Sequence, residues 1–375
     1  PYQLQDWRRG QRIVLTASPS FRGIAYTDSN DPADRATNAR FKGKRLPLIG
    51  KIEVAILDEG NPRLLAFEKG ELDLLEVPYE LVPNVMQPDN RLQPRFAKAG
   101  VLLERGIQPS ITYTWFNMED PVVGGYASAQ VALRRAISMA YNVDEEIRII
   151  RSGQGTPATQ ILPPGMAGYD AALDVGTRFD LAGAKALLDK FGYVDRDKDG
   201  WRDMPDGQPL VLRKGTSPSA LERQYDELWK RNMTAIGIRI EFVTQKWPDL
   251  LKMARLGQLQ MWQLGNTSAT TAGNPVLGLL YGPNAGLANL SRFRQANFDR
   301  LYDASRRLPD GKERTKLVRD MSLLVAAYAP WKINAYRYEN IALYPWVVGY
   351  KYNGFNQNPW QYLDIDLKLP RKYVE

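Results

Sequence analysis

The chain has 375 residues and a formal net charge of +8, and it contains neither cysteine nor histidine. Disulfides, thiolate nucleophiles, Ser-His-Asp triads and histidine-containing zinc sites are therefore excluded, and no carboxylate constellation indicates an enzyme. Basic and acidic residues are interleaved without a run of five like charges, which favours a solvated basic surface over a nucleic-acid site. No stretch approaches the roughly 18 apolar residues of a membrane span.

Strand and helix patterns alternate along the chain. In the first half of the chain, the sequence predicts strands over residues 11–17, 52–57, 72–77 and 110–117. It predicts a surface loop over 28–45, a helix capped by Asn61, a helix over 129–141 and a helix capped by Asn142. In the second half, the sequence predicts a loop over 156–168 and strands over 238–243, 332–338 and 362–367. It predicts a helix capped by Asp180, a helix opened by Pro248, and helices over 220–236, 298–307 and 311–329. This mixture indicates an α/β architecture.

One phrase occurs twice. Residues 64–77 read LLAFEKGELDLLEV, and residues 251–264 read LKMARLGQLQMWQL. Each copy has helical apolar spacing before a glycine, Gly70 or Gly257, and a buried-strand pattern after it. Glycine readily takes the left-handed conformation that ends a helix. The two copies therefore indicate two lobes built alike, an arrangement that commonly holds a ligand between the lobes.

Several longer phrases resemble bacterial solute-binding proteins of the oligopeptide/dipeptide-binding type (extracellular solute-binding protein family 5), which serve ABC importers. The similar phrases are PYQLQDWRRGQRIVL at 1–15, LLAFEKGELDL at 64–74, ALRRAISMAYNVDEEI at 132–147, GQGTPATQILPPG at 153–165, AKALLDKFGYVDRDKDGWRDMPDG at 184–207, LWKRNMTAIGIRIEFVTQKWPDLL at 228–251 and PWVVGY at 345–350. Their order and spacing cover essentially the whole chain, which is similar to the C-terminal two-thirds of such a protein.

The resemblance implies a two-lobed α/β fold of the periplasmic-binding-protein type (type II) that closes about a hinge. Residues 1–108 and 337–375 would belong to the first lobe, and residues 109–336 would form the second. We expect the first lobe to be incomplete, because the chain opens on a strand with no earlier neighbour and family members carry a preceding segment.

The resemblance also places ligand-binding residues at strand ends and in the two segments that cross between the lobes. The candidates are Tyr113, Trp115, Trp247, Asn266, Thr267, Ser268, Thr271, Tyr336 and Arg337. Arg337 would suit a carboxylate or phosphate group. Structural alternatives stay open, because only one face of each strand can line a site. Trp247 could equally be a core residue, and residues 265–274 a surface connection.

The loop 265–274 departs from the family pattern. Peptide-binding relatives commonly have Gly-Trp at its start and an aspartate that pairs with the peptide amine. Here Asn266 follows Gly265, and no acid occurs over residues 265–296. A free α-amino group would lack a charge-assisted hydrogen bond worth roughly 1.5–3 kcal/mol. The sequence therefore favours a peptide with a blocked amine, or a non-peptide solute.

Residues 195–206 (DRDKDGWRDMPD) have the carboxylate spacing of an EF-hand calcium loop, with Gly200 at the sixth position. The candidate ligands of a structural Ca²⁺ are Asp195, Asp197, Asp199, Asp203 and Asp206. The alternative is an acidic turn without metal, since Arg202 replaces an apolar residue and Asp206 is shorter than the usual glutamate. No other cofactor is expected.

Together these features predict an exported binding protein without enzymatic activity, periplasmic or tethered to the cell surface. It would capture a peptide-like or other polar solute and deliver it to an ABC importer. The expected partners are the solute, the permease subunits and the missing N-terminal segment of the same protein, with no nucleic acid. The alternative is a ligand-sensing or docking module that signals to a membrane receptor.

Overall fold

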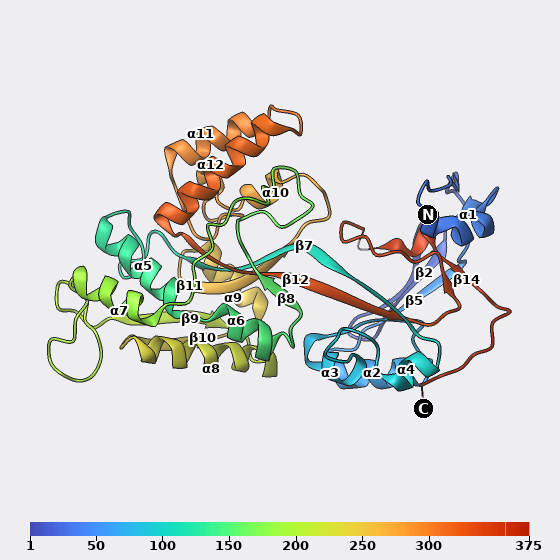
Figure 1. The fold of residues 1–375 in the computed structure, drawn as a ribbon, viewed down its shortest axis with the longest axis horizontal. Coiled ribbons are helices and arrows are strands. Elements are labelled where there is room, and N and C mark those ends of the chain that lie inside the picture. Colours follow the sequence, from blue (N-terminus) through green and yellow to red (C-terminus); the bar gives the residue numbers. More distant parts are fainter. Residues whose placement is uncertain (357, 375) are drawn as a thin grey trace. The chain divides into compact units, whose positions relative to one another are not determined.

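The computed structural model describes residues 1–356 and 358–374, and it divides into two compact units (Figure 1). Unit 1 comprises Pro1–Gly106 and Tyr338–Glu375, and unit 2 comprises Ile107–Arg337. These bounds differ by one or two residues from those of the predicted lobes. The division falls inside two long strands, β7 (Leu102–Phe116) and β12 (Trp331–Leu343), which each continue from one unit into the other.

Unit 1 combines small antiparallel sheets with short helices. Its strands are β1 (Tyr2–Arg8), β2 (Arg12–Ala17) and β5 (Lys51–Ala55) in the order β1-β2-β5, the pair β3 (Ile24–Ala25) and β4 (Arg45–Leu46), the pair β13 (Val347–Val348) and β14 (Asp364–Ile365), and β6 (Leu74–Glu76) paired with the end of β12. Its α-helices are α1 (Arg35–Phe41), α2 (Gly60–Glu68), α3 (Val82–Val85) and α4 (Pro94–Lys98). Aromatic side chains such as Phe67, Phe96 and Tyr344 fill the core of this unit.

Unit 2 is built on a mixed sheet in the order β10-β9-β11-β7-β12, with β8 (Gly155–Pro157) paired to β12. The other strands are β9 (Val211–Thr216), β10 (Arg239–Thr244) and β11 (Met261–Thr267). Its α-helices are α5 (Ser128–Ala140), α6 (Val143–Glu145), α7 (Leu181–Lys190), α8 (Ala220–Ala235), α9 (Trp247–Arg255), α10 (Asn274–Leu277), α11 (Ala296–Ser305) and α12 (Lys312–Tyr328). Helices α5, α7 and α8 contribute to the main apolar core, and α11 lies beside α12 (Figure 1).

The repeated phrase forms the predicted structure in both units. In unit 1, helix α2 ends before Gly70 and β6 follows, and in unit 2, helix α9 ends before Gly257 and β11 follows. The two glycines have φ of 73° and 74°, the left-handed values that a helix stop of this kind requires. The predicted helix–glycine–strand unit is therefore confirmed twice.

Some local predictions are wrong or incomplete. Asn61 lies inside α2, whose capping position is Glu59, so the cap predicted for that helix is wrong. Asn142 does accept the backbone N–H of Glu145 at 3.0 Å, but the chain then continues into a π-helical turn over Glu146–Ile150. β1 and β9 were not expected from the sequence.

One edge of the unit 2 sheet gathers several strand ends. β9 runs parallel to both β10 and β11, so Thr216, Thr244 and Thr267 end these strands at the same edge. β7 runs antiparallel to β11 and pairs Ser110 with Thr267, which brings Ser110 to this edge too. We call the three strand ends with Ser110 the carboxyl edge. Ligands of open α/β sheets bind beyond the carboxyl ends of strands.

Candidate ligand-binding site

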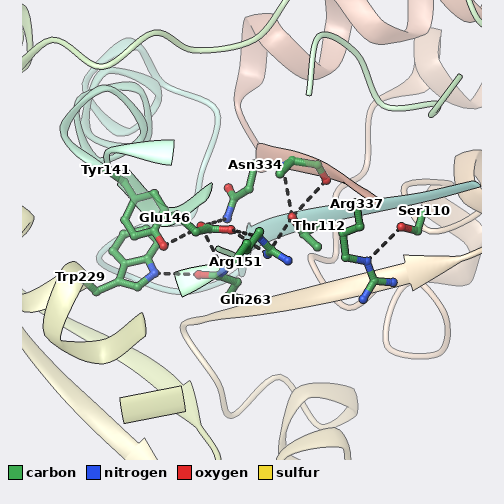
Figure 2. Close-up of polar contacts among 10 residues, drawn as sticks. Ser110, Thr112, Tyr141, Glu146, Arg151, Trp229, Gln263, Asn334 and Arg337 are labelled. Atoms are coloured by element: carbon green, nitrogen blue, oxygen red, sulfur yellow. Dashed lines mark hydrogen bonds and ion pairs between the residues drawn. The ribbon is translucent and has the colours of Figure 1, made fainter. Parts of the chain in front are cut away.

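Arg337 lies at the carboxyl edge and is held there by two hydroxyl groups. Its Nε donates to Ser110 Oγ at 3.0 Å, and its Nη2 donates to Thr267 Oγ1 at 2.7 Å (Figure 2 shows the Ser110 contact). Ser110 is fully buried, whereas Arg337 is partly exposed. The two predicted candidates Thr267 and Arg337 therefore meet, together with Ser110, which was not predicted.

An irregularity in β12 brings Arg337 to this face. Thr112 Oγ1 accepts from the backbone N–H of Ala335 and donates to its C=O, both at 3.1 Å, so a side chain occupies both backbone groups of one strand residue (Figure 2). Before this point, Lys332 and Asn334 face the buried polar residues of unit 2. Beyond Ala335, Arg337 faces the same side as Asn334, although regular alternation places residues three positions apart on opposite faces. The alternation of the strand therefore shifts by one residue at Ala335.

A buried ion-pair network lies next to the carboxyl edge. Glu146 Oε1 accepts from Arg151 at 2.7 Å (Nη2) and 2.8 Å (Nε), and Glu146 Oε2 accepts from the Tyr141 hydroxyl at 2.7 Å (Figure 2). The two charged side chains are 0% and 4% exposed. Burial and the Glu146 carboxylate raise the pKa of Tyr141 well above its ordinary value, so its hydroxyl stays a donor.

The network joins distant segments of unit 2. Gln263 on β11 and Asn334 on β12 each donate to Glu146 Oε2 at 3.4 Å, and Arg151 Nη2 donates to Thr112 Oγ1 at 3.4 Å. Trp229 on α8 donates its indole N–H to Gln263 at 2.9 Å. Three strands and two helical segments are thereby connected by one buried acid.

Lys332 is buried beside this network. Its side chain is 1% exposed, its Nζ lies 5.4 Å from the Tyr141 ring centre, and it has no hydrogen-bond partner among the described residues. Burial lowers the pKa of Lys332 to about 8, although the Glu146 and Asp144 carboxylates favour the charged form. Sequence reasoning gave no signal for Glu146, Arg151 or Lys332, because their burial depends on segments far away in the chain.

Three predicted ligand-binding residues are buried inside unit 2. Tyr113 stacks on Trp331 with ring centres 3.7 Å apart, and Trp115 is 1% exposed. The Tyr336 hydroxyl donates to the carbonyl groups of Gln160 and Leu162 and accepts from the Gln160 N–H. These contacts favour packing roles for Tyr113, Trp115 and Tyr336.

The remaining candidates differ in exposure. Trp247 opens α9 directly beyond the carboxyl edge, is 54% exposed and lies 6.2 Å from the Trp262 ring. Asn266 is partly exposed and alternates with Thr267, so the two side chains point to opposite faces of β11. Ser268 is buried and donates to Thr270 O at 2.8 Å, while Thr271 is exposed. Thr267 contacts Arg337, whereas Trp247 packs near Trp262, whose side chain points to the opposite face of β11 from Thr267.

The acidic loop brings together three of its five predicted calcium ligands. Carboxylate oxygens of Asp195, Asp197 and Asp199 lie within 4.8 Å of one another, and all three residues are exposed. Asp203 accepts from the Arg196 N–H at 3.0 Å and Asp206 from the Gln208 N–H at 3.1 Å, and neither belongs to this group. The five-ligand arrangement expected from the spacing is therefore not formed.

Calcium binding at this loop remains a prediction. Because Arg239 pairs with Asp199 at 3.1 Å and offsets part of the negative charge, we expect weak binding, with a dissociation constant of roughly 0.1–1 mM. Isothermal titration with Ca²⁺ should give saturable heat for the native chain and for Asp206→Asn, and no heat for Asp197→Asn. Equal heats in all three proteins, or none in any, would remove the calcium site.

The sequence decides the family. Residues 1–287 match the family described as bacterial extracellular solute-binding proteins, family 5, middle region. This match covers well over half of the chain. The chain belongs to the family 5 solute-binding proteins.

Individual family members agree with this assignment. The chain is 27% identical over 338 residues to heme-binding protein A of Haemophilus influenzae, covering 88% of this chain and 56% of that protein. It is 23% identical to the dipeptide-binding protein of Escherichia coli, covering 90% of this chain and 55% of that protein. The chain thus spans about half the length of these curated relatives.

A solved structure shows the same fold. The oligopeptide-binding protein AppA from Bacillus subtilis, solved with a nonapeptide, superposes with a TM-score of 0.75 at 16% identity, covering 98% of this chain and 66% of that one. The predicted α/β fold of the two-lobed binding-protein type is confirmed by this likeness. No helix among the described residues is long and apolar enough to cross a membrane.

Proposed function

We propose that the protein containing this chain captures a polar solute and delivers it to the permease of an ABC importer. The observation that carries the proposal is the set of polar groups at the carboxyl edge of a family 5 fold. There Arg337 is held by Ser110 and Thr267. The proposed solute-binding residues on this face are Arg337 and Thr267, with Ser110 as a positioning residue, and Asn266 and Trp247 would contact a solute from the opposite face of β11.

The site supports binding better than catalysis. The buried Glu146 carboxylate is paired with Arg151, and the Asp226 carboxylate accepts a hydrogen bond from Lys214. The family also supports an exported, periplasmic location and the permease subunits as partners.

Native mass spectrometry of protein purified without denaturation tests this proposal. The expected result is a population heavier than the protein by the mass of one small molecule, which disappears after unfolding and refolding. Addition of the recovered solute to the refolded protein should restore the heavier species and raise the melting temperature. A protein that carries no solute, and whose melting temperature does not respond to extracts of its growth medium, would contradict the function.

A further inference from the structure

Arg337 differs from the buried arginines of unit 2 in how its charge is balanced. Arg151 pairs with the Glu146 carboxylate. Arg134, fully buried, donates to the carbonyl groups of Val123, Tyr328 and Ala329, and the last two lie at the C-terminal end of α12, where the helix dipole favours a cation. Arg337 has neither kind of partner. Its hydrogen bonds run to two neutral hydroxyl groups.

Two donors of the Arg337 guanidinium are fixed, and the rest of the group is open. Nη1 of Arg337 makes no hydrogen bond or ion pair within the described residues. The neighbouring position on β11 is Gly265, which is exposed, and a Cβ added there would lie 3.6 Å from the guanidinium carbon and both terminal nitrogens. Any side chain larger than glycine would therefore begin to cover the planar group, and the glycine leaves it accessible.

The groups that hydrogen-bond to Arg337 are neutral hydroxyl groups. Ser110 and Thr267 each accept from the arginine; the Ser110 hydroxyl donates to Gln108 Oε1 at 3.4 Å, and the Thr267 hydroxyl proton is left available to another acceptor. The loop that follows Thr267 has no acid over residues 265–296. A guanidinium presents a planar fork of donors that matches the two oxygens of a carboxylate or phosphate.

We infer that the solute carries an anionic group, a carboxylate or a phosphate, that binds to the free side of the Arg337 guanidinium with help from the Thr267 hydroxyl. This inference deepens the proposed function and rests on it. Ser110 and Thr267 orient the guanidinium, and Gly265 keeps it open.

Equilibrium dialysis with defined probes tests the inference. The probes are a pool of N-acetylated tripeptides with a free C-terminal carboxylate, the same pool with a C-terminal amide, and inorganic phosphate. The proteins are the unmodified full-length chain, Arg337→Gln, Arg337→Lys, and Arg231→Gln as a control. Arg231 is 60% exposed on α8 and pairs with Glu145, so its loss removes one positive charge away from the site. Thermal melting of each variant separates loss of binding from loss of folding.

The unmodified protein and Arg231→Gln should retain members of the acid pool, or phosphate, with little retention of the amide pool. Arg337→Gln should lower this affinity by roughly 10- to 100-fold, because a charge-assisted hydrogen bond is lost. The affinity of Arg337→Lys should lie between the affinities of the unmodified protein and of Arg337→Gln. Retention of the acid pool identifies a carboxylate, and retention of phosphate alone identifies a phosphate-bearing solute.

Three outcomes would overturn the inference: equal retention of acid and amide pools, equal affinity in Arg337→Gln, or no retention of any anion. The proposed function fails separately. If native mass spectrometry recovers a neutral or cationic solute, the protein still binds a solute and only the anionic group is excluded. If neither a recovered solute nor any probe binds, both the function and the inference are contradicted.

Discussion

Replacing Glu146 with glutamine is expected to lower the free energy of unfolding by about 3–5 kcal/mol, because the substitution leaves a buried arginine charge without its partner. Both side chains of the Glu146–Arg151 pair are almost completely removed from solvent. Glutamine keeps the size of the side chain and one acceptor oxygen, so the loss of charge is the main change. Urea denaturation followed by tryptophan fluorescence measures the effect.

The adjacent glutamate supplies a matched control. Glu145 pairs with Arg231, whose side chain is 60% exposed, so Glu145→Gln should change the free energy of unfolding by less than about 1 kcal/mol. The double variant Glu146→Gln/Arg151→Met removes both charges and should recover part of the lost stability. If Glu146→Gln costs no more than Glu145→Gln, the network is not the stabilising feature that its burial indicates.

Replacing Lys332 with methionine is expected to stabilise the protein at neutral pH. The folded pKa of about 8 lies below the ordinary value of 10.5, so folding disfavours the charged amine. This shift corresponds to about 3 kcal/mol of destabilisation when the lysine is charged in both states. Methionine keeps the apolar stem and removes the charge, so Lys332→Met should recover much of this energy at pH 7.

The gain from Lys332→Met should depend on pH in a defined direction. Below pH 8 the lysine is protonated in both states and the full penalty applies. Between pH 8 and 10.5 the unfolded chain holds more protons than the folded one, so the native protein becomes relatively more stable as pH rises. The difference in unfolding free energy should therefore shrink to about 1 kcal/mol at pH 9.5.

Lys316→Met is the control for this pH series, since Lys316 is 75% exposed and pairs with Asp320 on the surface of α12. The effect of Lys316→Met on the free energy of unfolding should be small and nearly constant with pH. A destabilising effect of Lys332→Met, equal at pH 7 and pH 9.5, would show that the buried lysine stabilises the fold through contacts instead of straining it.

The parts of the fold that depend on local sequence were predictable. Helix α8 has apolar residues at core spacing, starts at a serine cap whose Oγ accepts the Glu222 N–H at 3.1 Å, and ends before Gly237 with φ of 74°. The Asp180 cap of α7 likewise accepts the Gly183 N–H at 2.8 Å. Such signals lie within a few residues of one another, so a single sequence contains them.

Strand β9 was missed because its burial depends on a distant partner. Its sequence, VLRKGT, contains two basic residues and a glycine, which do not resemble a central strand. Lys214 is nevertheless fully buried, because its Nζ donates to Asp226 Oδ1 on α8 at 2.8 Å. A charged residue in a central position is acceptable only with such a partner, and the sequence does not show which acid provides it.

The candidate site was predicted in part. Arg337 and Thr267 were identified from their places near the hinge segments and at a strand end, and they do meet. Ser110 and Gly265 were not recognised as their neighbours, because the contact requires the register of β7 against β11. Tyr113 and Tyr336 were proposed as ligand contacts, yet their faces of the strands are buried, and a period-2 pattern cannot say which face is covered.

The contact between Thr112 and Ala335 bears on how related chains should be aligned. Asn334 and Arg337 lie on the same face of β12, which fits the alternation of the strand only if Ala335 is not counted. Ala335 is therefore the extra residue of β12. A relative with β12 one residue shorter at this position would present the same faces. An alignment gap placed elsewhere in the strand would match Arg337 to a residue that points into the opposite side of the sheet. Gap placement at Ala335 therefore determines which residue of a relative is matched to Arg337.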